Sequence, residues 1–328
     1  MRVIVTGGGG FIGSNLVDLL LKDKKIKKIT IIDIFNLGYR NISHLRKNKR
    51  IKIVRKDINK IKPNDKNFRN INCVFHLAAI ADIVPSIVNP IKYCESNIYG
   101  TINILEAMRY NKVNRIVYTA SASCYGIPKK FPTPENDRID LQYPYAFTKY
   151  IGEQSVIHWS KVYGIKYISL RLFNVYGLRS RTSGAYGAVM GVFLKQKLEN
   201  KSLTVVGDGS QSRDFINVID VCRAFISASK TKKTNKIINI GSSKPTKVIT
   251  LAKMISSKID FIPKRPGEPD ISRAKIKNAE NYLKWKPRVN FKSGIEELLK
   301  NIHFWKQAPL WNRSKIKKAT KIWFKYLK

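Results

Sequence analysis

The segment Thr-Gly-Gly-Gly-Gly-Phe-Ile-Gly at residues 6–13 constrains the fold of this chain more than any other feature. It follows a short β-branched run and precedes a stretch in which apolar residues have helical spacing. A strand, a glycine turn and a helix in this order form a cradle for dinucleotide phosphates. Gly7 would permit the tight turn, Gly10 the approach of a pyrophosphate, and Gly13 close packing of the helix on the strand. The helix N-terminus would then present free N–H groups to the phosphates.

An acidic residue at the end of the second β-branched run indicates which dinucleotide is bound. Asp33 follows residues 29–32 and lies 20 residues after Gly13. A carboxylate at this place accepts hydrogen bonds from the adenosine ribose and repels a 2′-phosphate, which favours NAD over NADP. Taken alone, Asp33 is equally compatible with a turn or cap role. Arg40 is close enough in the chain to weaken the exclusion of NADP.

Composition sets limits on the class of protein. With 328 residues, of which 43% are hydrophobic, the chain has enough material for one large α/β domain and a smaller one. It contains no run of about 18 apolar residues, so we expect no membrane insertion. The first strand starts too early for a signal peptide, and the four cysteines form no C-x-x-C pair. We therefore expect a cytoplasmic protein. The histidines have no metal-ligand spacing, and no metal is expected.

The net charge of +40, from 62 basic and 22 acidic residues, is the least usual property of the sequence. Such a field attracts polyanions, so an RNA-binding role is an alternative. The lysines are nevertheless spread through the whole chain, and no basic motif interleaved with aromatic residues is present. We expect a dispersed bias without a specific nucleic-acid site. The field would help to recruit a doubly charged nucleotide sugar.

Strand-like runs alternate with helical patterns, which predicts an α/β fold with a Rossmann-type, doubly wound parallel sheet. The predicted strands are residues 3–5, 29–32, 51–54, 73–77, 115–119, 167–172 and 237–240. Ligands should lie at the C-terminal ends of these strands. We expect residues 1–176, with returning segments near 215–245, to form the NAD-binding domain. Residues 177–328 would mainly form a smaller substrate-binding α/β domain.

The C-terminal segment predicts a basic amphipathic helix. From Ser314 onward, Ile316, Ala319, Trp323 and Leu327 fall on one face, with lysines elsewhere. A helix docked on the body of the protein is the favoured interpretation. A helix for a membrane surface or a partner is the alternative.

Tyr145 and Lys149 are the strongest candidates for catalysis. At positions i and i+4 they share one helical face, where an ammonium can stabilise a phenolate and lower the pKa of the tyrosine. Tyr145 could then take a proton from a sugar hydroxyl while a hydride leaves to the cofactor. Ser121 follows the strand at 115–119 and could hydrogen-bond the reacting oxygen. Each residue alone has an ordinary structural alternative, such as a surface pair or a turn cap.

Together these motifs resemble the extended short-chain dehydrogenase/reductase family, and within it the nucleotide-sugar epimerases and dehydratases. The resemblance covers almost the whole chain. Besides the glycine turn, Ser121, Tyr145 and Lys149, it includes Asp57-Ile58, His76-Leu77-Ala78-Ala79, Asn97 to Thr101, Arg171 to Gly177, Arg213-Asp214-Phe215 and Arg265-Pro266-Gly267-Glu268.

The resemblance implies a set of site residues. Asp57 and Ile58 would contact the adenine, Phe173 would lie near the nicotinamide, and a group of polar residues would hold the substrate diphosphate. The implied cofactor-binding residues are Gly7, Gly10, Phe11, Ile12, Gly13, Asp33, Asn36, Asp57, Ile58, Leu77, Ala78, Ala79, Asn97, Tyr145, Lys149 and Phe173. The implied substrate-binding residues are Ser86, Ser121, Ser123, Asn174, Val189, Val205, Val206, Arg213, Arg265, Glu268 and Ser272. Among these, Asn174, Arg213 and Arg265 would take the diphosphate, and Val205 and Val206 would flank a uracil or thymine ring.

Two positions after Ser121 favour 4-epimerisation over the other reactions of these enzymes. Dehydratases that resemble this chain carry an acidic pair there, and the decarboxylases usually carry a glutamate. This chain has Ala122 and Ser123, neither of which is a general acid at neutral pH. We expect an NAD-dependent 4-epimerase that passes through a 4-keto sugar. A dTDP-glucose 4,6-dehydratase, a UDP-glucuronate decarboxylase or epimerase, and a non-catalytic NAD- or RNA-binding relative are the alternatives.

The sugar and the assembly are expected only by resemblance. Ser272 falls where similar epimerases gate the space for a 2-acetamido group, and residues 183–189 resemble a loop of epimerases for UDP-N-acetylhexosamines. UDP-GlcNAc/UDP-GalNAc is therefore slightly favoured over UDP-glucose/UDP-galactose. Family members usually dimerise through a four-helix bundle. The helix that holds Tyr145 and the helix at 98–110 are the candidates, so we expect a homodimer.

Overall fold

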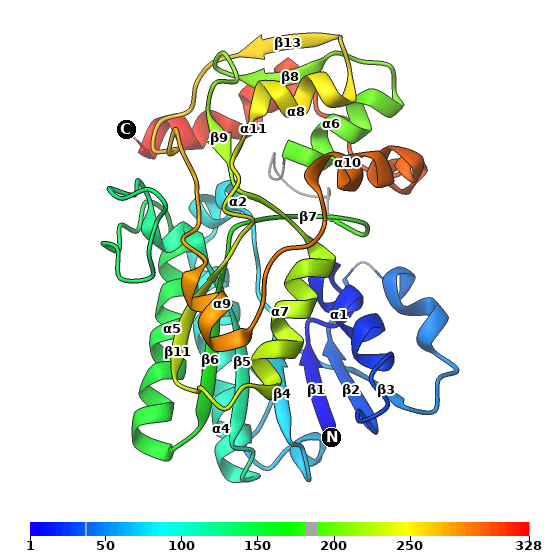
Figure 1. Ribbon diagram of the computed structural model, residues 1–328, viewed down its shortest axis with the longest axis vertical. Coiled ribbons are helices and arrows are strands. Elements are labelled where there is room, and N and C mark those ends of the chain that lie inside the picture. The colour runs from blue at the N-terminus through cyan, green and yellow to red at the C-terminus, as the bar shows by residue number, and fades with distance from the viewer. Residues whose placement is uncertain (37, 181–188, 328) are drawn as a thin grey trace.

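The computed structural model in Figure 1 describes residues 1–36, 38–180 and 189–327. Its main element is a seven-stranded sheet in the order β11-β6-β5-β4-β1-β2-β3. Every pairing in the sheet is parallel. The strands are β1 (Arg2–Thr6), β2 (Lys28–Asp33), β3 (Ile51–Arg55), β4 (Cys73–His76), β5 (Arg115–Ser121), β6 (Lys166–Leu172) and β11 (Lys236–Ile240). Each corresponds to one predicted strand, so the doubly wound α/β prediction is confirmed.

Burial on both faces explains why these strands are nearly continuous apolar runs. Val5 pairs with Ile31 of β2 and with Phe75 of β4, and all three belong to the core on one face of the sheet. Their neighbours Ile4 and Ile32 belong to the core on the other face. Parallel sheets covered on both faces have this pattern. The strand order reverses between β1 and β4, which places a ligand crevice at the C-terminal ends of these two strands.

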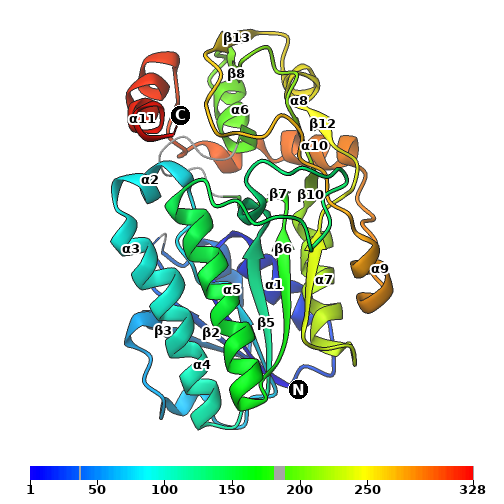
Figure 2. The ribbon, with the colours of Figure 1, turned by 90° about the vertical axis from the view of Figure 1, so that its left-hand side faces the viewer.

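Helices cover the two faces of the sheet. Helices α1 (Phe11–Leu21) and α7 (Val218–Lys230) pack on one face. Helices α4 (Gly100–Tyr110) and α5 (Pro144–Tyr163) pack on the other face and lie side by side in Figure 2. Helix α5 starts with proline at its first position, where the missing N–H costs no hydrogen bond. It ends at Gly164, whose φ of 71° suits a left-handed C-cap.

A smaller α/β unit lies above the C-terminal ends of the sheet strands (Figure 1). Its strands β8 (Leu203–Val206) and β13 (Ile259–Ile262) are parallel. Its core includes Phe193, Leu298 and Trp305. Its helices are α6 (Val189–Leu198), α8 (Val248–Ile255), α10 (Phe291–Lys300) and α11 (Arg313–Tyr326). The short pairs β7 (Asn174–Tyr176) with β10 (Phe215–Asn217) and β9 (Ser212–Arg213) with β12 (Thr246–Lys247) join this unit to the sheet.

Short elements complete the described chain. They are η1 (Arg40–Leu45), η2 (Ile58–Lys60), η3 (Lys66–Phe68), α2 (Ile83–Val88), α3 (Pro90–Cys94), the π-helical turn η4 (Glu95–Tyr99), η5 (Ala122–Tyr125), α9 (Lys277–Leu283) and η6 (Ile302–Trp305). Several of them follow strand ends and therefore border the crevice.

The C-terminal helix α11 is docked on the body of the protein, as its favoured interpretation predicted. Ile316, Thr320 and Trp323 are each at most 3% exposed. The helix contacts α2, which lies after β4. Among the described residues, no helix has both the length and the apolar character needed to cross a bilayer.

Candidate active site

The glycine turn has the geometry of a phosphate cradle. Gly7 has a φ of +70°, and a Cβ there would lie 2.7 Å from the backbone nitrogen of Ala78. At Gly13 a Cβ would lie 2.1 Å from the carbonyl oxygen of Gly7, because α1 packs directly against the turn. At Gly10, by contrast, a Cβ would meet only that same oxygen, at 3.2 Å. Side chains are therefore excluded at Gly7 and Gly13 by protein atoms, whereas Gly10 borders open space.

The start of α1 and the end of β2 fit the pyrophosphate and the adenosine ribose of a dinucleotide. Gly10 is the N-cap of α1 and has no side-chain capping bond, so the amides at Phe11 and Ile12 begin the helix without a competing side chain. The carboxylate of Asp33 accepts hydrogen bonds from the nitrogens of Gly9 (2.9 Å) and Phe35 (2.8 Å). Asp33 thus caps backbone amides, which is the structural role that the sequence offered as an alternative to ribose binding. Each carboxylate oxygen keeps a second acceptor site, so a ribose hydroxyl can also be bound.

A buried network behind the turn was not foreseen from the sequence. The hydroxyl of Thr6 lies 2.7 Å from Nδ1 of His76 and accepts the amides of Leu77 (3.1 Å) and Ala78 (3.2 Å). Nε2 of His76 is 3.0 Å from the hydroxyl of Thr101. Burial lowers the pKa of His76 to about 3, so the ring is neutral. The network fixes the ends of β1 and β4, where the predicted cofactor residues Leu77 and Ala78 lie.

Asn97 lies in the π-helical turn η4 and connects two parts of the crevice. Its Oδ1 accepts the amide of Ile80 at 2.8 Å, and its Nδ2 donates to the carbonyl of Ile80 and to the hydroxyl of Thr148, both at 3.0 Å. The side chain therefore holds the segment after β4 against α5. Only 1% of Asn97 is exposed. Its predicted contact with the cofactor stays a prediction.

Tyr145, Ser121 and Lys149 come together at the C-terminal end of β5. Tyr145 is in the first turn of α5, and its hydroxyl is hydrogen-bonded to Ser121, the last residue of β5. Burial raises the pKa of Tyr145, and the bond to Ser121 opposes that shift. Burial lowers the pKa of Lys149 to about 7, with an opposing effect from Glu153 one turn later. The predicted lowering of the tyrosine pKa is therefore not found in the protein alone.

Lys149 is held by an aromatic ring rather than by a direct carboxylate partner among the described residues. Its Nζ lies 4.6 Å from the ring centre of Tyr118, and only 5% of the residue is exposed. Glu153 instead forms a buried pair with Arg171, at 2.6 Å, and accepts a bond from Ser169. Arg171 and Ser169 satisfy the hydrogen-bonding groups of the Glu153 carboxylate. The negative charge of Glu153 still favours the protonated form of Lys149.

The two positions after Ser121 contain no acid. The hydroxyl of Ser123 donates to Oγ of Ser121 at 2.8 Å, and its backbone nitrogen donates to the same oxygen at 3.2 Å. These bonds orient Ser121, which is the N-cap of the short turn η5. Ala122 and Ser123 are the first two residues of that turn. Neither side chain ionises near neutral pH.

Asp82 lies near Tyr145, the predicted catalytic tyrosine, and sequence reasoning missed it. Its φ of 98° is rare for a residue other than glycine, and its charge raises the pKa of Tyr145. The hydroxyl of Tyr93 donates to the carbonyls of Ala81 (3.0 Å) and Asp82 (2.8 Å) and so holds this backbone. No local pattern marks Asp82, because its position depends on the path of the chain after β4.

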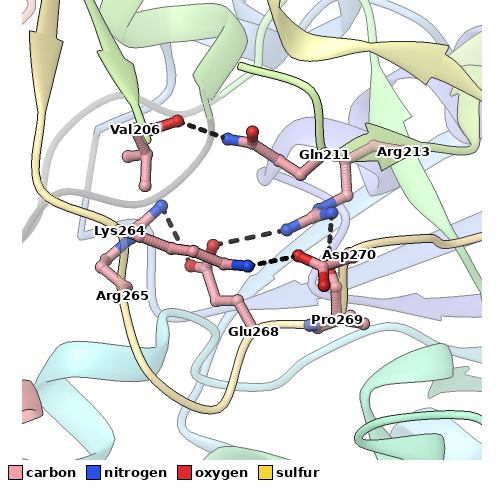
Figure 3. Close-up of a pocket in the computed structure, with 8 residues that line it drawn as sticks. All are labelled: Val206, Gln211, Arg213, Lys264, Arg265, Glu268, Pro269 and Asp270. Carbon is pink, nitrogen blue, oxygen red and sulfur yellow. Dashed lines mark hydrogen bonds and ion pairs between the residues drawn. The ribbon is translucent and has the colours of Figure 1, made fainter. Parts of the chain in front are cut away.

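The predicted phosphate-binding arginines lie together on the smaller unit (Figure 3). Glu268 lies between them, 3.3 Å from Nη2 of Arg213 and 3.0 Å from Nη2 of Arg265. Arg213 also donates to the carbonyl of Pro269 at 2.7 Å. Burial lowers the pKa of Arg213, and the charge of Glu268 opposes this. Two guanidinium groups around one anion can also coordinate a diphosphate.

The small pocket between the arginines contains one of the two predicted base-flanking valines. Val206 lines it, together with Gln211 and Lys264. Val205 is fully buried in the core of the smaller unit and does not line this pocket. The base-flanking role of both valines stays a prediction, with direct support from the pocket for Val206 alone.

The remaining predicted substrate residues are distributed around the crevice. Ser86 is fully buried, and its hydroxyl donates to Ile83 within α2, so it does not face the crevice with a free hydroxyl. Asn174 is exposed in β7 next to Phe215. Ser272 is hydrogen-bonded through its amide to Ser212, beside Arg213. Val189 begins α6, and the predicted loop at 183–188 lies outside the described residues.

The residues predicted for the adenine and nicotinamide ends have mixed exposure. Asp57 caps η2 by accepting the amide of Asn59, whereas Ile58 is 5% exposed and packs on Gly100. Phe173 is buried after β6. Asn36 and Ala79 are exposed at the ends of β2 and β4.

Two further sequence-based points concern NADP and metals. The guanidinium of Arg40 lies over the ring of Phe304, 4.6 Å from its centre, and it also donates to the Phe304 carbonyl. These contacts hold the Arg40 side chain against Phe304 of the smaller unit.

In the part of the chain that the structure describes, no three His, Cys, Asp or Glu side chains gather in a way that would hold a metal ion.

Comparisons with known proteins agree with this geometry. Residues 3–241 match the model of the NAD dependent epimerase/dehydratase family. A putative UDP-glucose 4-epimerase of Methanocaldococcus jannaschii is 37% identical over 305 residues, covering 90% of this chain and 97% of the relative.

Solved structures give the same result. The UDP-N-acetylglucosamine 4-epimerase of Methanobrevibacter ruminantium, in complex with UDP-N-acetylmuramic acid, is 31% identical with a TM-score of 0.86, covering 91% of this chain and 97% of that one. The UDP-glucuronic acid 4-epimerase of Bacillus cereus, with UDP-glucuronic acid and NAD, is 33% identical with a TM-score of 0.85, covering 94% and 99%. The resemblance derived from the sequence motifs is therefore confirmed. The chain belongs to the NAD dependent epimerase/dehydratase family, whose cofactor is NAD.

Proposed function

We propose that the protein is a UDP-sugar 4-epimerase. The observation that carries the proposal is the pairing of Tyr145 with Ser121 at the end of β5, without an acid at Ala122 or Ser123. This arrangement supports proton transfer at one sugar hydroxyl but provides no acid at these positions to expel a second one. The similarity to 4-epimerases supports the same conclusion.

The residues of the chain have separable tasks in this reaction. Tyr145 takes the proton of the 4-hydroxyl and later returns it, while Ser121 hydrogen-bonds the same oxygen. Lys149, with a pKa near neutrality, supplies positive charge next to the phenolate as it forms. NAD, which the glycine turn and Asp33 would hold, would supply the hydride acceptor and donor that oxidation and reduction at C4 require.

The two parts of the chain would divide substrate and cofactor between them. Residues 1–176, with the returning segments near 215–245, would hold NAD on the glycine turn and Asp33. Residues 177–328 would hold the nucleotide diphosphate through Arg213 and Arg265. A sugar that is anchored only by its diphosphate can rotate about that link between the two hydride transfers. A 4-epimerase requires this rotation, because the hydride must return to the opposite face.

The sugar is the less constrained part of the proposal. The small side chain at Ser272 favours UDP-GlcNAc and UDP-GalNAc, and one similar structure is a UDP-N-acetylglucosamine 4-epimerase. UDP-glucose and UDP-galactose are the second candidate pair, supported by the relative from Methanocaldococcus jannaschii.

The test is to incubate the purified protein separately with UDP-glucose, UDP-GlcNAc, UDP-glucuronate and dTDP-glucose and to identify products by NMR. A 4-epimer of a UDP sugar is the expected product. A 4-keto-6-deoxy sugar or loss of carbon dioxide would refute the argument from Ala122 and Ser123. The Tyr145→Phe variant is the matched control, because it keeps the ring and lacks the hydroxyl.

We also propose that the protein is a homodimer that pairs through α4 and α5. The two helices lie side by side in Figure 2. They and the turn η4 that precedes α4 include the exposed apolar residues Tyr99, Tyr110, Phe147 and Val162. Large exposed apolar residues grouped on neighbouring helices are typical of a protein interface. Sedimentation should give a dimer, and the Phe147→Glu variant should shift it towards monomer. A monomeric unaltered protein would refute the proposal.

A further inference from the structure

Trp323, near the end of the chain, is buried against the substrate side of the crevice. Only 1% of this residue is exposed, although it belongs to a helix rich in lysine. Its indole Nε1 donates to the carbonyl of Pro266 at 2.8 Å. The guanidinium of the adjacent Arg265 lies over the indole ring, 5.2 Å from its centre. One side chain of α11 thus holds both the backbone and the charged group of the predicted diphosphate-binding loop.

The same indole also contacts the other wall of the crevice. Its ring centre lies 6.3 Å from that of Tyr143, the residue just before α5. Tyr143 in turn lies parallel to Tyr145, with ring centres 6.5 Å apart and planes 6° from each other. Burial raises the pKa of Tyr143, which keeps it neutral. An aromatic row therefore runs from α11 to the tyrosine that would move the proton.

The rest of α11 reinforces these contacts. The helix contacts α2, and both views place the two helices next to each other, with α11 above α2 in Figure 2. Gly267, in the loop that carries Arg265, has a φ of +70°. A Cβ added at Gly267 would lie 4.0 Å from the Cβ of Leu327, so the loop borders the end of α11. The C-terminal helix therefore spans from the sheet side of the crevice to the Arg265–Glu268 loop.

We infer that α11 is part of the substrate site and that Trp323 is a positioning residue for Arg265 and Tyr143. The inference rests on the proposed function in one respect, which is that Arg265 binds the substrate diphosphate. A guanidinium needs a fixed direction to use its fork on phosphate oxygens, and the indole face supplies a fixed, favourable surface for the cation. The bond to Pro266 fixes the loop from which Arg265 extends.

A helix that only covers apolar surface would behave differently. Its loss would weaken the fold as a whole, and the binding of UDP and NAD would fall together. A positioning role instead predicts a selective loss of affinity for the nucleotide diphosphate, since the glycine turn that holds NAD makes no contact with Trp323 among the interactions described above.

The experiment compares full-length variants by calorimetric titration with UDP and, separately, with NAD. Trp323→Leu should weaken UDP binding by about tenfold or more, because it removes the cation–π contact, the hydrogen bond and the contact with Tyr143. Trp323→Phe keeps a ring under Arg265 but loses the donor to Pro266, so UDP affinity should fall by only about threefold. NAD affinity should change by less than about twofold in both. Phe324→Leu is the matched control on the exposed side of the same helix, where 45% of the residue is exposed, and should change neither.

The outcomes separate the inference from the proposed function. Equal UDP affinity in Trp323→Leu and the unaltered protein would overturn the inference and leave the 4-epimerase proposal intact. A parallel loss of UDP and NAD binding would also overturn it, in favour of a purely structural helix. If Trp323→Leu does not fold, Trp323→Phe decides, and unchanged UDP affinity in that variant overturns the inference. Failure of the unaltered protein to bind UDP would overturn both proposals.

Discussion

The burial of Lys149 leads to a quantitative prediction about stability. The residue is 5% exposed, and burial lowers its pKa from the ordinary 10.5 to about 7. Each pKa unit corresponds to about 1.36 kcal/mol. Holding the ammonium in this position therefore costs the folded state about 5 kcal/mol at a pH where both folded and unfolded chains are protonated.

The sign of the pH dependence follows from the lowered pKa. Below pH 7, Lys149 is protonated in both states and the full cost is present. Between pH 7 and 10.5 the folded protein releases the proton while the unfolded chain keeps it, so the cost decreases as the pH rises. At about pH 8.5 roughly 3 kcal/mol should remain, and near pH 10.5 almost none.

The Lys149→Met variant removes the charge and retains a flexible side chain of similar length against Tyr118. We expect its free energy of unfolding to exceed that of the unaltered protein by about 5 kcal/mol near pH 6 and by about 3 kcal/mol near pH 8.5. The gain should vanish near pH 10.5. Urea unfolding of both proteins, freed of bound nucleotide, measures the difference at each pH. Turnover of the sugar should be lost.

Lys161→Met is the matched control, because Lys161 is an exposed lysine on the same helix. It should show no such gain at any pH. If Lys149→Met is no more stable than the unaltered protein near pH 6, or if its advantage grows with pH, then Lys149 is not a buried charge that costs stability, and the reasoning is refuted.

Three further predictions concern the cofactor and the reaction. Tyr145→Phe should lower kcat by at least about 100-fold while NAD remains bound, because the proton acceptor is lost; product NMR that shows near-normal turnover would contradict this. Gly13→Ala would place a Cβ 2.1 Å from the oxygen of Gly7 and should weaken NAD binding by more than about tenfold in a fluorescence titration; unchanged affinity would mean that the turn is not the cradle. Asp33→Asn keeps an acceptor for the amide of Gly9 but removes the charge, so the affinity for NADP relative to NAD should rise by about tenfold. An unchanged ratio would show that Asp33 does not select the cofactor.

Features that depend on neighbouring residues were predictable from the sequence. The glycine turn was one of these, because Gly7 has a φ of +70° and a Cβ at Gly13 would meet the carbonyl of Gly7 within the turn itself. The seven strands were predictable for a similar reason, since strands buried on both faces must be runs of apolar residues. The Tyr145 and Lys149 pair needed only the periodicity of a helix.

Features that depend on where distant segments meet were not predictable in this way. Asp82 has no motif and becomes a neighbour of Tyr145 only through the path of the chain after β4, and Tyr143 meets Trp323 only where α11 docks. The predicted lowering of the pKa of Tyr145 is not found in the protein alone for the same reason. Helical spacing places an ammonium on the same face, but burial is a property of the whole fold and raises the pKa.

The sequence by itself determined the class of fold, and it predicted the dinucleotide cradle and the Tyr145–Lys149 pair, because each is encoded within one strand, turn or helix. Only the tertiary structure decided how these parts act together. Glu268 joins Arg213 to Arg265, and the C-terminal helix brings Trp323 to the same loop from more than fifty positions along the chain. Such contacts arise from packing between elements, where charge, burial and direction are set by residues that no local pattern connects.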